Sequence, residues 1–330
     1  MTHAWARIAI GVCAALLVIY LANASWMWGS PGRATLITHL GMHQQFDERG
    51  LSLYACKGDR MLPPTHPYLE NTIAGIGEAF QLGADMGDVD VQPTKDGDYV
   101  VFHDARLECR TNGRGSVWDK TVPQLKMLDI GYGYTADHGR TYPFRGKFVG
   151  SMPTLGEMLD AFPNRRFMLI MKSNNPEEAD LLLAWLQRHH VDLRRIQVMG
   201  GDRPAARLHI LAPTLRVGSE QILKLCLKRY LAIGWSGMIP ASCRNTVMMV
   251  PFNYRRAMWG WPNLLVERMA RANSSVVLIG DFERHSDKPG MNMIETQAQL
   301  DALPRDYAGQ IFVSRIEMIG PAARARGMLN

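Results

Sequence analysis

Two aspartates and a histidine in the segment 83–104 could together bind a cation and transfer a proton. Asp88 and Asp90 are two residues apart in a stretch of strand-like composition, so both carboxylates are expected on one face of a strand. The Asp96-Gly97 pair is typical of a tight two-residue hairpin turn, and this turn predicts a register in which His103 faces Asp90, with Cβ atoms about 5 Å apart. Carboxylates bind hard divalent cations, and an imidazole beside them can accept or donate a proton. The alternative is a surface hairpin that carries solvated charges.

The predicted elements around this hairpin alternate between strands and helices. Strands are expected at residues 35–38, 85–91, 167–172, 196–199, 215–218, 246–251, 276–279 and 310–313. Helices are expected at residues 155–162, 176–189, 204–211, 221–233, 262–272 and 296–303, and another helical segment follows Glu70. Eight strands that alternate with helices predict parallel pairing and an α/β fold, the (β/α)8 TIM barrel, whose active site lies at the carboxyl ends of the strands. His39, Asp88, Asp90 and Lys172 lie at or near such ends.

The composition is that of a globular protein with a sizeable core. The chain has 330 residues, of which 47% are hydrophobic and 21% charged, and its net charge is +6. The basic residues are spread along the chain, and no recognised nucleic-acid-binding motif accompanies them, so we expect no nucleic-acid partner. A mild positive charge suits phosphate-bearing substrates or anionic lipid head groups equally well.

The N-terminal segment differs in composition from the rest of the chain. Residues 8–24 are almost uniformly apolar, with Arg7 before them and Trp26 and Trp28 after them. This run is near the ~20 residues that span a bilayer, and tryptophans are enriched at the membrane–water interface, which together favour an uncleaved anchor. A cleaved secretory signal is the alternative, with Ala22-Asn23-Ala24 as its cleavage site.

Both interpretations export the rest of the chain. We therefore expect an N-terminal anchor or signal at residues 1–30 and one TIM-barrel domain at residues 31–330. With a retained anchor, the barrel is expected on the periplasmic face of a bacterial inner membrane. With a cleaved signal, it is secreted.

The cysteines are consistent with export. Four of the five, an even number that could form two disulfides, lie outside the apolar run, and disulfides persist in exported proteins. Three pairings of these four are possible, and we expect disulfides Cys56–Cys109 and Cys226–Cys243. The first of these would fasten the long segment before Glu70 to the loop after the hairpin. Four buried free thiols are the alternative. The cysteines lack a C-x2-C spacing, so structural zinc is not expected.

Several short motifs occur in a fixed order over residues 36–173. They are His39-x-Gly41, Glu70-Asn71-Thr72, the hairpin 83–104, Arg110-Thr111-Asn112-Gly113-x-Gly115, Met152-Pro153-Thr154-Leu155 and Lys172-Ser173. In this combination the chain resembles the glycerophosphodiester phosphodiesterase family. The resemblance is thinner beyond residue 173, where the rhythm of strands and helices remains.

The resemblance implies a metal-dependent TIM-barrel enzyme of lipid metabolism. It implies hydrolysis of glycerophosphodiesters, or of lysophospholipid-like phosphodiesters, to glycerol phosphate and an alcohol, with Ca2+ or Mg2+ as the cation. At the matching positions, His39 and His103 would be the acid and the base, and Asp88 and Asp90 would ligate the metal. Lys172 would contact the phosphate.

Three positions depart from the family pattern. Leu40 stands where the family has an arginine, Asp88 where it has a glutamate, and Ile170 where it has a third carboxylate on the next strand. Glu70 could compensate for the missing carboxylate or contact the substrate, so it is a further candidate substrate-binding residue. The departures at Leu40 and Ile170 leave one alternative open, a catalytically weakened barrel that binds phosphate head groups at the cell envelope. A separate alternative is a related phospholipase D-type lyase that forms a cyclic phosphate.

Overall fold

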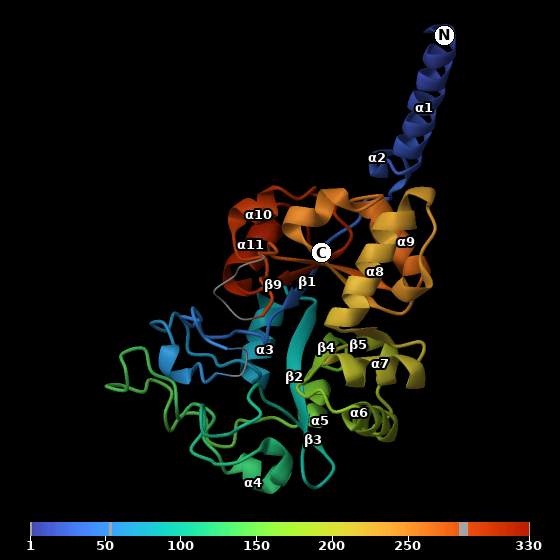
Figure 1. Cartoon of the computed structure of the whole chain (residues 1–330). Coiled ribbons are helices and arrows are strands. Elements are labelled where there is room, and N and C mark those ends of the chain that lie inside the picture. The colour runs from blue at the N-terminus through green and yellow to red at the C-terminus, as the bar shows by residue number, and fades with distance from the viewer. Residues whose placement is uncertain (1, 53–54, 284–289, 330) are drawn as a thin grey trace.

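The structure, a computed structural model, describes residues 2–52, 55–283 and 290–329 and contains the expected barrel (Figure 1). Eight parallel strands follow the order β6-β5-β4-β2-β1-β9-β8-β7, and a single bridge between Val217 and Thr246 closes the ring between β6 and β7. Their bounds are β1 Thr35–Thr38, β2 Met86–Pro93, β4 Arg166–Met171, β5 Ile196–Met199, β6 Arg216–Gly218, β7 Val247–Pro251, β8 Ser275–Ile279 and β9 Gln310–Val313. The predicted TIM-barrel fold is confirmed, and each predicted strand is present within two residues at each end.

Helices surround the barrel. Those that alternate with the barrel strands are α3 Ile73–Gln81, α5 Leu155–Ala161, α6 Glu177–Arg188, α7 Asp202–Leu211, α8 Glu220–Ile233, α9 Asn263–Arg271, α10 Gln297–Asp301 and α11 Ile316–Ala325. Two short helices, α2 Ser25–Trp28 and α4 Val122–Lys126, lie in connecting segments. The predicted helices are confirmed, although α10 is shorter than expected. Helix α11 is an addition, because its sequence contains Pro321 and did not suggest a helix.

The strands bury side chains on both of their faces, as strands of a parallel barrel must. Inward-facing residues fill the barrel with a cluster rich in methionine: Ile37, Met86, Met168, Met199, Val247, Met249, Val277, Ile279 and Phe312. Outward-facing residues such as Leu36, Leu169 and Val198 pack against the helices. Because this cluster fills the middle of the barrel, the polar residues near the carboxyl ends of the strands face a mouth with an apolar floor.

The register of the hairpin differs by one residue from the expected register. Strand β3, Tyr99–Val101, pairs with β2 through Val91 and Val101, and the backbone N–H of Phe102 donates to the Asp90 carbonyl at 3.0 Å. Phe102 therefore lies opposite Asp90, and the prediction that His103 faces it across a two-residue turn is wrong. Thr94 causes the difference, because its N–H donates to the Asp98 carbonyl at 2.9 Å and its hydroxyl accepts from the Asp98 N–H at 3.2 Å. These bonds close a longer loop over residues 95–97.

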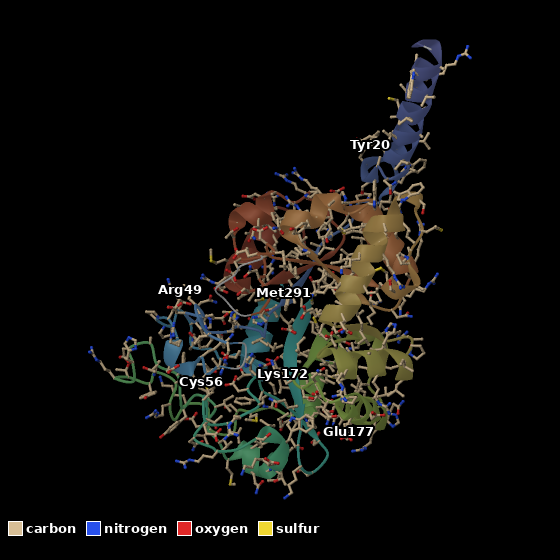
Figure 2. All side chains as sticks on the ribbon, viewed as in Figure 1. Tyr20, Arg49, Cys56, Lys172, Glu177 and Met291 are labelled. Atoms are coloured by element: carbon tan, nitrogen blue, oxygen red, sulfur yellow. A yellow bond between two sulfur atoms is a disulfide. The ribbon has the colours of Figure 1, made fainter. Side chains whose placement is uncertain are left out.

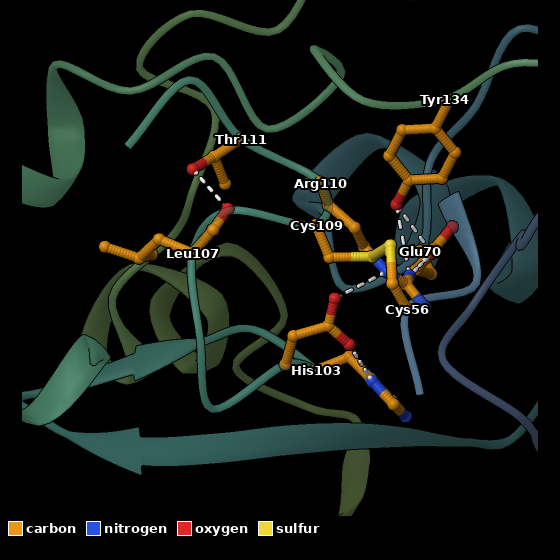
Figure 3. Close-up of a disulfide and its surroundings, with 9 residues drawn as sticks. Cys56, Glu70, His103, Leu107, Cys109, Arg110, Thr111 and Tyr134 are labelled. Carbon is orange, nitrogen blue, oxygen red and sulfur yellow. Dashed lines mark hydrogen bonds and ion pairs between the residues drawn. A yellow bond between two sulfur atoms is a disulfide. The ribbon is translucent and has the colours of Figure 1, made fainter. Parts of the chain in front are cut away.

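Two disulfides fasten the connecting segments in the pairing expected from the sequence, Cys56–Cys109 and Cys226–Cys243. The first joins the long segment after β1 to the segment after the hairpin, next to the candidate site (Figure 3). The second joins α8 to a short 3-10 helix, Ala241–Cys243, that precedes β7.

Helix α1, Thr2–Ala22, projects away from the barrel (Figure 1). Its segment Ala4–Ala22 has a mean hydropathy of 2.1, and none of these residues is buried. The helix is therefore long and apolar enough to cross a membrane. A signal sequence has the same length and composition.

Candidate active site

The carboxyl ends of β1, β2 and β4 bring together most of the residues that the sequence singled out. His39 directly follows β1, Asp88 and Asp90 lie in β2, and Lys172 directly follows β4 (Figure 2 labels Lys172). The ammonium Nζ of Lys172 lies 3.0 Å from Asp90 Oδ1. His39 and His103 lie near enough to Asp90 to interact with it electrostatically.

Asp90 is the most fully bonded acid of this group. It is 2% exposed, and Asn71 binds it twice: the Asn71 amide donates to Asp90 Oδ2 at 2.9 Å and accepts from the Asp90 N–H at 3.1 Å. Burial alone would raise the pKa of Asp90, but Lys172, His103 and Asn71 outweigh it and lower the pKa to about 2. Asp90 is therefore a fixed negative charge at the mouth of the barrel. Asn71 is part of the Glu70-Asn71-Thr72 motif, but the sequence did not predict its hydrogen bonds to Asp90.

Asp88 is in the opposite state. It is 1% exposed, and its Oδ1 has no hydrogen-bond partner among the residues that the structure describes. Burial and the nearby charge of Asp90 raise its pKa well above the usual value, although Lys172 and a backbone bond from Leu40 oppose them. A carboxylate in this position gains stability from a nearby positive charge.

His39 is a partly buried imidazole that is held in the neutral form. Burial and the neighbouring His43, whose ring centroid lies 5.1 Å away, hold the pKa of His39 well below 6.5. Within the described part of the chain, its Nδ1 has no hydrogen-bond partner. The turn that presents it depends on Gly41, which has φ of +79°, and a Cβ there would lie 2.9 Å from the backbone of Gly75 in α3.

His103 is held by a chain of charged side chains (Figure 3). Its Nδ1 lies 2.5 Å from Asp104 Oδ1, and Asp104 Oδ2 forms an ion pair with Arg110 Nε at 3.0 Å. Arg110 in turn bonds to Glu70, which also accepts from the Tyr134 hydroxyl at 2.7 Å. The carboxylate at Nδ1 favours the Nδ1–H tautomer and leaves Nε2 free for chemistry.

Asp104 and Arg110 were not identified as functional from the sequence. Both lie inside the matched motifs, directly after His103 and Cys109, and a carboxylate next to a candidate histidine was the available signal. The sequence could not reveal that Arg110 turns back onto Asp104. His43 was also missed, although it lies only four residues after His39.

Glu70 is bonded to the network of side chains that holds His103. It precedes the N-cap of α3, which is Thr72, and its Oε1 bonds to Arg110 and Tyr134. Its Oε2 is buried and unpaired among the described residues, and Glu70, Arg110 and Tyr134 line a small cavity of about 10 Å³. A cavity of this size holds about one water molecule. A contact between Glu70 and the substrate stays a prediction.

The acids at the mouth fit a cation that is only partly coordinated by protein. In the described ranges, no group of three or more His, Cys, Asp or Glu side chains is arranged to hold a metal ion. The position beside Asp90 on β4 is taken by Ile170, in direct register. Even so, the unpaired buried oxygen of Asp88 and the neighbouring charge of Asp90 are what a hard cation would satisfy, with water completing its shell.

These features define a TIM barrel that carries two imidazoles, two carboxylates and a lysine at its mouth. Residues 57–200 match the model of the glycerophosphoryl diester phosphodiesterase family. Together with the relatives below, this match confirms the resemblance to the glycerophosphodiester phosphodiesterase family that the motifs predict.

Two bacterial relatives illustrate the sequence similarity. The chain is 32% identical over 155 residues to a glycerophosphodiester phosphodiesterase of Caldanaerobacter subterraneus subsp. tengcongensis, covering 45% of this chain and 60% of that protein. It is 37% identical over 126 residues to a glycerophosphodiester phosphodiesterase of Bacillus subtilis, covering 36% of this chain and 42% of that protein. The matched segments thus span less than two thirds of these relatives.

Solved structures share the fold over most of the chain. A glycerophosphodiester phosphodiesterase from Agrobacterium tumefaciens superposes with a TM-score of 0.55 at 19% identity, covering 87% of this chain and 99% of that one. A phosphodiesterase from Oleispira antarctica, solved with the product sn-glycerol-3-phosphate, superposes with a TM-score of 0.52 at 16% identity, covering 91% of this chain and 99% of that one.

Proposed function

We propose that this protein hydrolyses a glycerophosphodiester to glycerol phosphate and an alcohol. The observation that carries the proposal is the pair of histidines, His39 and His103, beside the Asp90–Lys172 ion pair at the mouth of the barrel. Two imidazoles can serve as base and acid in one reaction, and an ammonium suits a phosphate. The glycerol phosphate product bound to the Oleispira antarctica phosphodiesterase is consistent with this substrate class.

The two histidines differ in a way that suggests separate roles. His39 is neutral with an unpaired ring nitrogen, so we assign it as the base that takes the proton of the attacking glycerol hydroxyl. His103, whose Nδ1–H faces Asp104, is assigned as the acid: in its doubly protonated form, which the Asp104 carboxylate favours, it gives the Nε2 proton to the leaving alkoxide as the phosphorus–oxygen bond breaks. The attack forms a cyclic phosphate and releases the alcohol. Water then opens the ring with the two roles exchanged: His103 takes a proton from the water, and His39 returns a proton to the glycerol oxygen. In this scheme Lys172 binds a phosphoryl oxygen.

Asp88 and Asp90 are the proposed ligands of a Ca2+ or Mg2+ ion. Such an ion, when bound, polarises the phosphoryl oxygens and offsets the charge that develops in the transition state. Asp88 supports this assignment, because its unpaired oxygen and raised pKa indicate that a positive charge nearby would stabilise it.

The chain as a whole is proposed to be an exported enzyme of lipid metabolism that is anchored by α1 in a bacterial inner membrane. The support is the exposed apolar helix together with two disulfides, which persist in oxidising compartments.

The test is a turnover assay on the full chain in detergent, with glycerophosphocholine and glycerophosphoethanolamine as substrates. We expect release of the alcohol with Ca2+ or Mg2+, loss of release with EDTA, and at least about 100-fold slower turnover for both His39→Ala and His103→Ala. His189→Ala is the matched control, since His189 lies at the end of α6 and stacks on Trp185. Turnover that is equal in the wild type and both site variants would contradict the proposal.

A second candidate function is binding of phosphate head groups without turnover. Ile170 favours it, because an aliphatic side chain stands beside Asp90 where a third acid would strengthen the cation site. This alternative predicts saturable binding of glycerol 3-phosphate with no product from either diester.

The lyase reaction is distinguished from hydrolysis by its product. Phosphorus NMR of the products separates the two, because the lyase reaction would stop at the cyclic phosphate.

A further inference from the structure

The carboxyl end of α1 is bonded to the barrel through the polar side chains of Asn23 and Arg268. Arg268 of α9 is 7% exposed, and its guanidinium donates to Asn23 Oδ1 at 2.7 Å and to the Ala22 carbonyl at 3.2 Å. The Asn23 amide donates onward to the carbonyl of Trp235 at 2.8 Å. A flexible tether would leave this junction solvated; here the helix end is a part of the barrel surface.

Ser25, two residues after Asn23, forms a second set of bonds between this segment and α9. Its hydroxyl oxygen accepts from the backbone N–H groups of Asn263 and Leu264, at 2.9 and 3.1 Å, and so caps the first turn of α9. Cleavage after Ala24 would remove two acceptors of the buried Arg268, Asn23 and the Ala22 carbonyl. The junction is therefore complete only when the helix is retained.

The junction lies at the amino-terminal end of the strands. Trp235 belongs to a 3-10 helix, Gly234–Ser236, that follows α8, and α8 runs back from the carboxyl end of β6. Asn263 donates to the carbonyl of Asp306, which shortly precedes β9. Both contacts therefore belong to the end of the barrel opposite the mouth that holds Asp90 and Lys172. Figure 1 shows α1 leaving from the side of α8 and α9, while β2 carries the hairpin in the opposite direction.

Exposed apolar side chains surround the junction. Trp26 is 73% exposed, Trp28 is 57% exposed, Trp235 is 44% exposed and Met238 is 60% exposed. Tryptophans with one apolar and one polar side prefer the membrane–water interface, and here they lie where a bilayer around α1 would end. A lipid surface is thus the occupant that this region fits.

We propose that α1 holds the amino-terminal end of the barrel against the bilayer, so that the active-site mouth faces water and takes a deacylated, water-soluble glycerophosphodiester. The substrate class rests on the proposed function, whereas the orientation does not. Strand β4 alone, with six residues, separates the two ends by roughly 20 Å. A lipid in the same bilayer would have to leave the membrane to reach the mouth, and each methylene withdrawn costs roughly a factor of four in the equilibrium.

The orientation is tested by lipid quenching of a single fluorophore. In a Cys13→Ser background with both disulfides oxidised, a label is attached at Met238→Cys beside the junction or at Lys95→Cys on the exposed hairpin tip. The full chain is reconstituted in phosphatidylcholine vesicles with a quencher on the lipid head group. We expect strong quenching at position 238 and at least about fivefold weaker quenching at position 95. Equal quenching at both positions, or stronger quenching at position 95, overturns the orientation.

The substrate class is tested in the same vesicles. Glycerophosphocholine in solution is compared with lysophosphatidylcholine in the bilayer, which carries the same head group on an acyl chain. We expect at least about 100-fold faster turnover of the soluble diester, and comparable turnover of the two overturns the substrate assignment. If neither is cleaved, the proposed hydrolysis fails and the substrate class fails with it, while the quenching result still decides the orientation.

Discussion

Ile170 of β4 is paired in register with Asp90 of β2, so an aliphatic side chain stands directly beside the best-bonded acid of the site. The neighbouring pair on the same two strands, Asp88 and Met168, repeats this arrangement one step deeper in the barrel. The acids of the site thus come from one strand, and the strand next to it contributes only Lys172, from just beyond its end.

Replacement of Ile170 by glutamate should create the missing third acid. We expect Ile170→Glu to bind Ca2+ at least about tenfold more tightly than the wild type, because affinity rises with the number of charged ligands. Isothermal titration calorimetry on the full chain measures this. Added Ca2+ should also raise the unfolding midpoint of the variant more than that of the wild type. Ile170→Gln is the control, because glutamine has the shape of glutamate without its charge. Equally tight Ca2+ binding by the two variants would show that charge is not the cause.

Loss of the Asp104 carboxylate should impair catalysis through His103. We expect Asp104→Asn to lower kcat by about 10²–10⁴ with little change in KM, since the amide no longer enforces the Nδ1–H tautomer. Steady-state kinetics with glycerophosphocholine measures both parameters. Asp119→Asn, at an exposed position on the same segment, serves as the control. A change confined to KM would assign Asp104 to substrate binding instead.

The two disulfides should separate stability from activity. The Cys226–Cys243 bond closes a loop of sequence separation 17, so its removal by paired alanines should cost about 3 kcal/mol of unfolding free energy and leave kcat unchanged. Removal of Cys56–Cys109, at separation 53, should cost about 4 kcal/mol and also lower kcat. The reason is that Cys109 precedes Arg110, which holds Asp104. Equal kcat in both paired variants would contradict this role for Arg110.

Much of the fold was predictable, because each barrel strand is a short apolar run between helical segments. The region 167–172 illustrates this. Its strand is largely buried on both faces, so its sequence is a continuous apolar run that can be identified as a strand without knowing which strands it pairs with. The hairpin register was not predictable from Asp96-Gly97. A side chain outside that pair, Thr94, bonds to Asp98 and lengthens the loop by one residue. Helix α11 was hidden by Pro321, which the structure accommodates within the helix.

The candidate site was predictable where the positions of its residues depend only on their spacing along one strand or motif. Asp88 and Asp90 share a face because they are two residues apart on a strand, and their motif places them at the correct end of the barrel. The contacts of Arg110 with Asp104 and Glu70 depend on how a long connecting segment folds back, which no periodicity encodes. The lowered pKa of His39 was likewise hidden, since it follows from partial burial and from the neighbouring His43 in the folded chain.

The stability of the protein should depend on pH through His43. Burial lowers the pKa of His43 from 6.5 to about 4, although Glu317 opposes the effect. The folded state therefore binds fewer protons than the unfolded state between these values, and stability is present above about pH 6.5 and is lost as the pH falls toward 4. This group alone should lower the unfolding free energy by on the order of 2 kcal/mol between pH 7 and pH 4.5, measured by urea unfolding. His43→Asn should lose that share of the decrease, whereas His138→Asn, on a distant loop, should keep it. An unchanged pH dependence in His43→Asn would mean that the pKa of His43 does not differ between the folded and unfolded states.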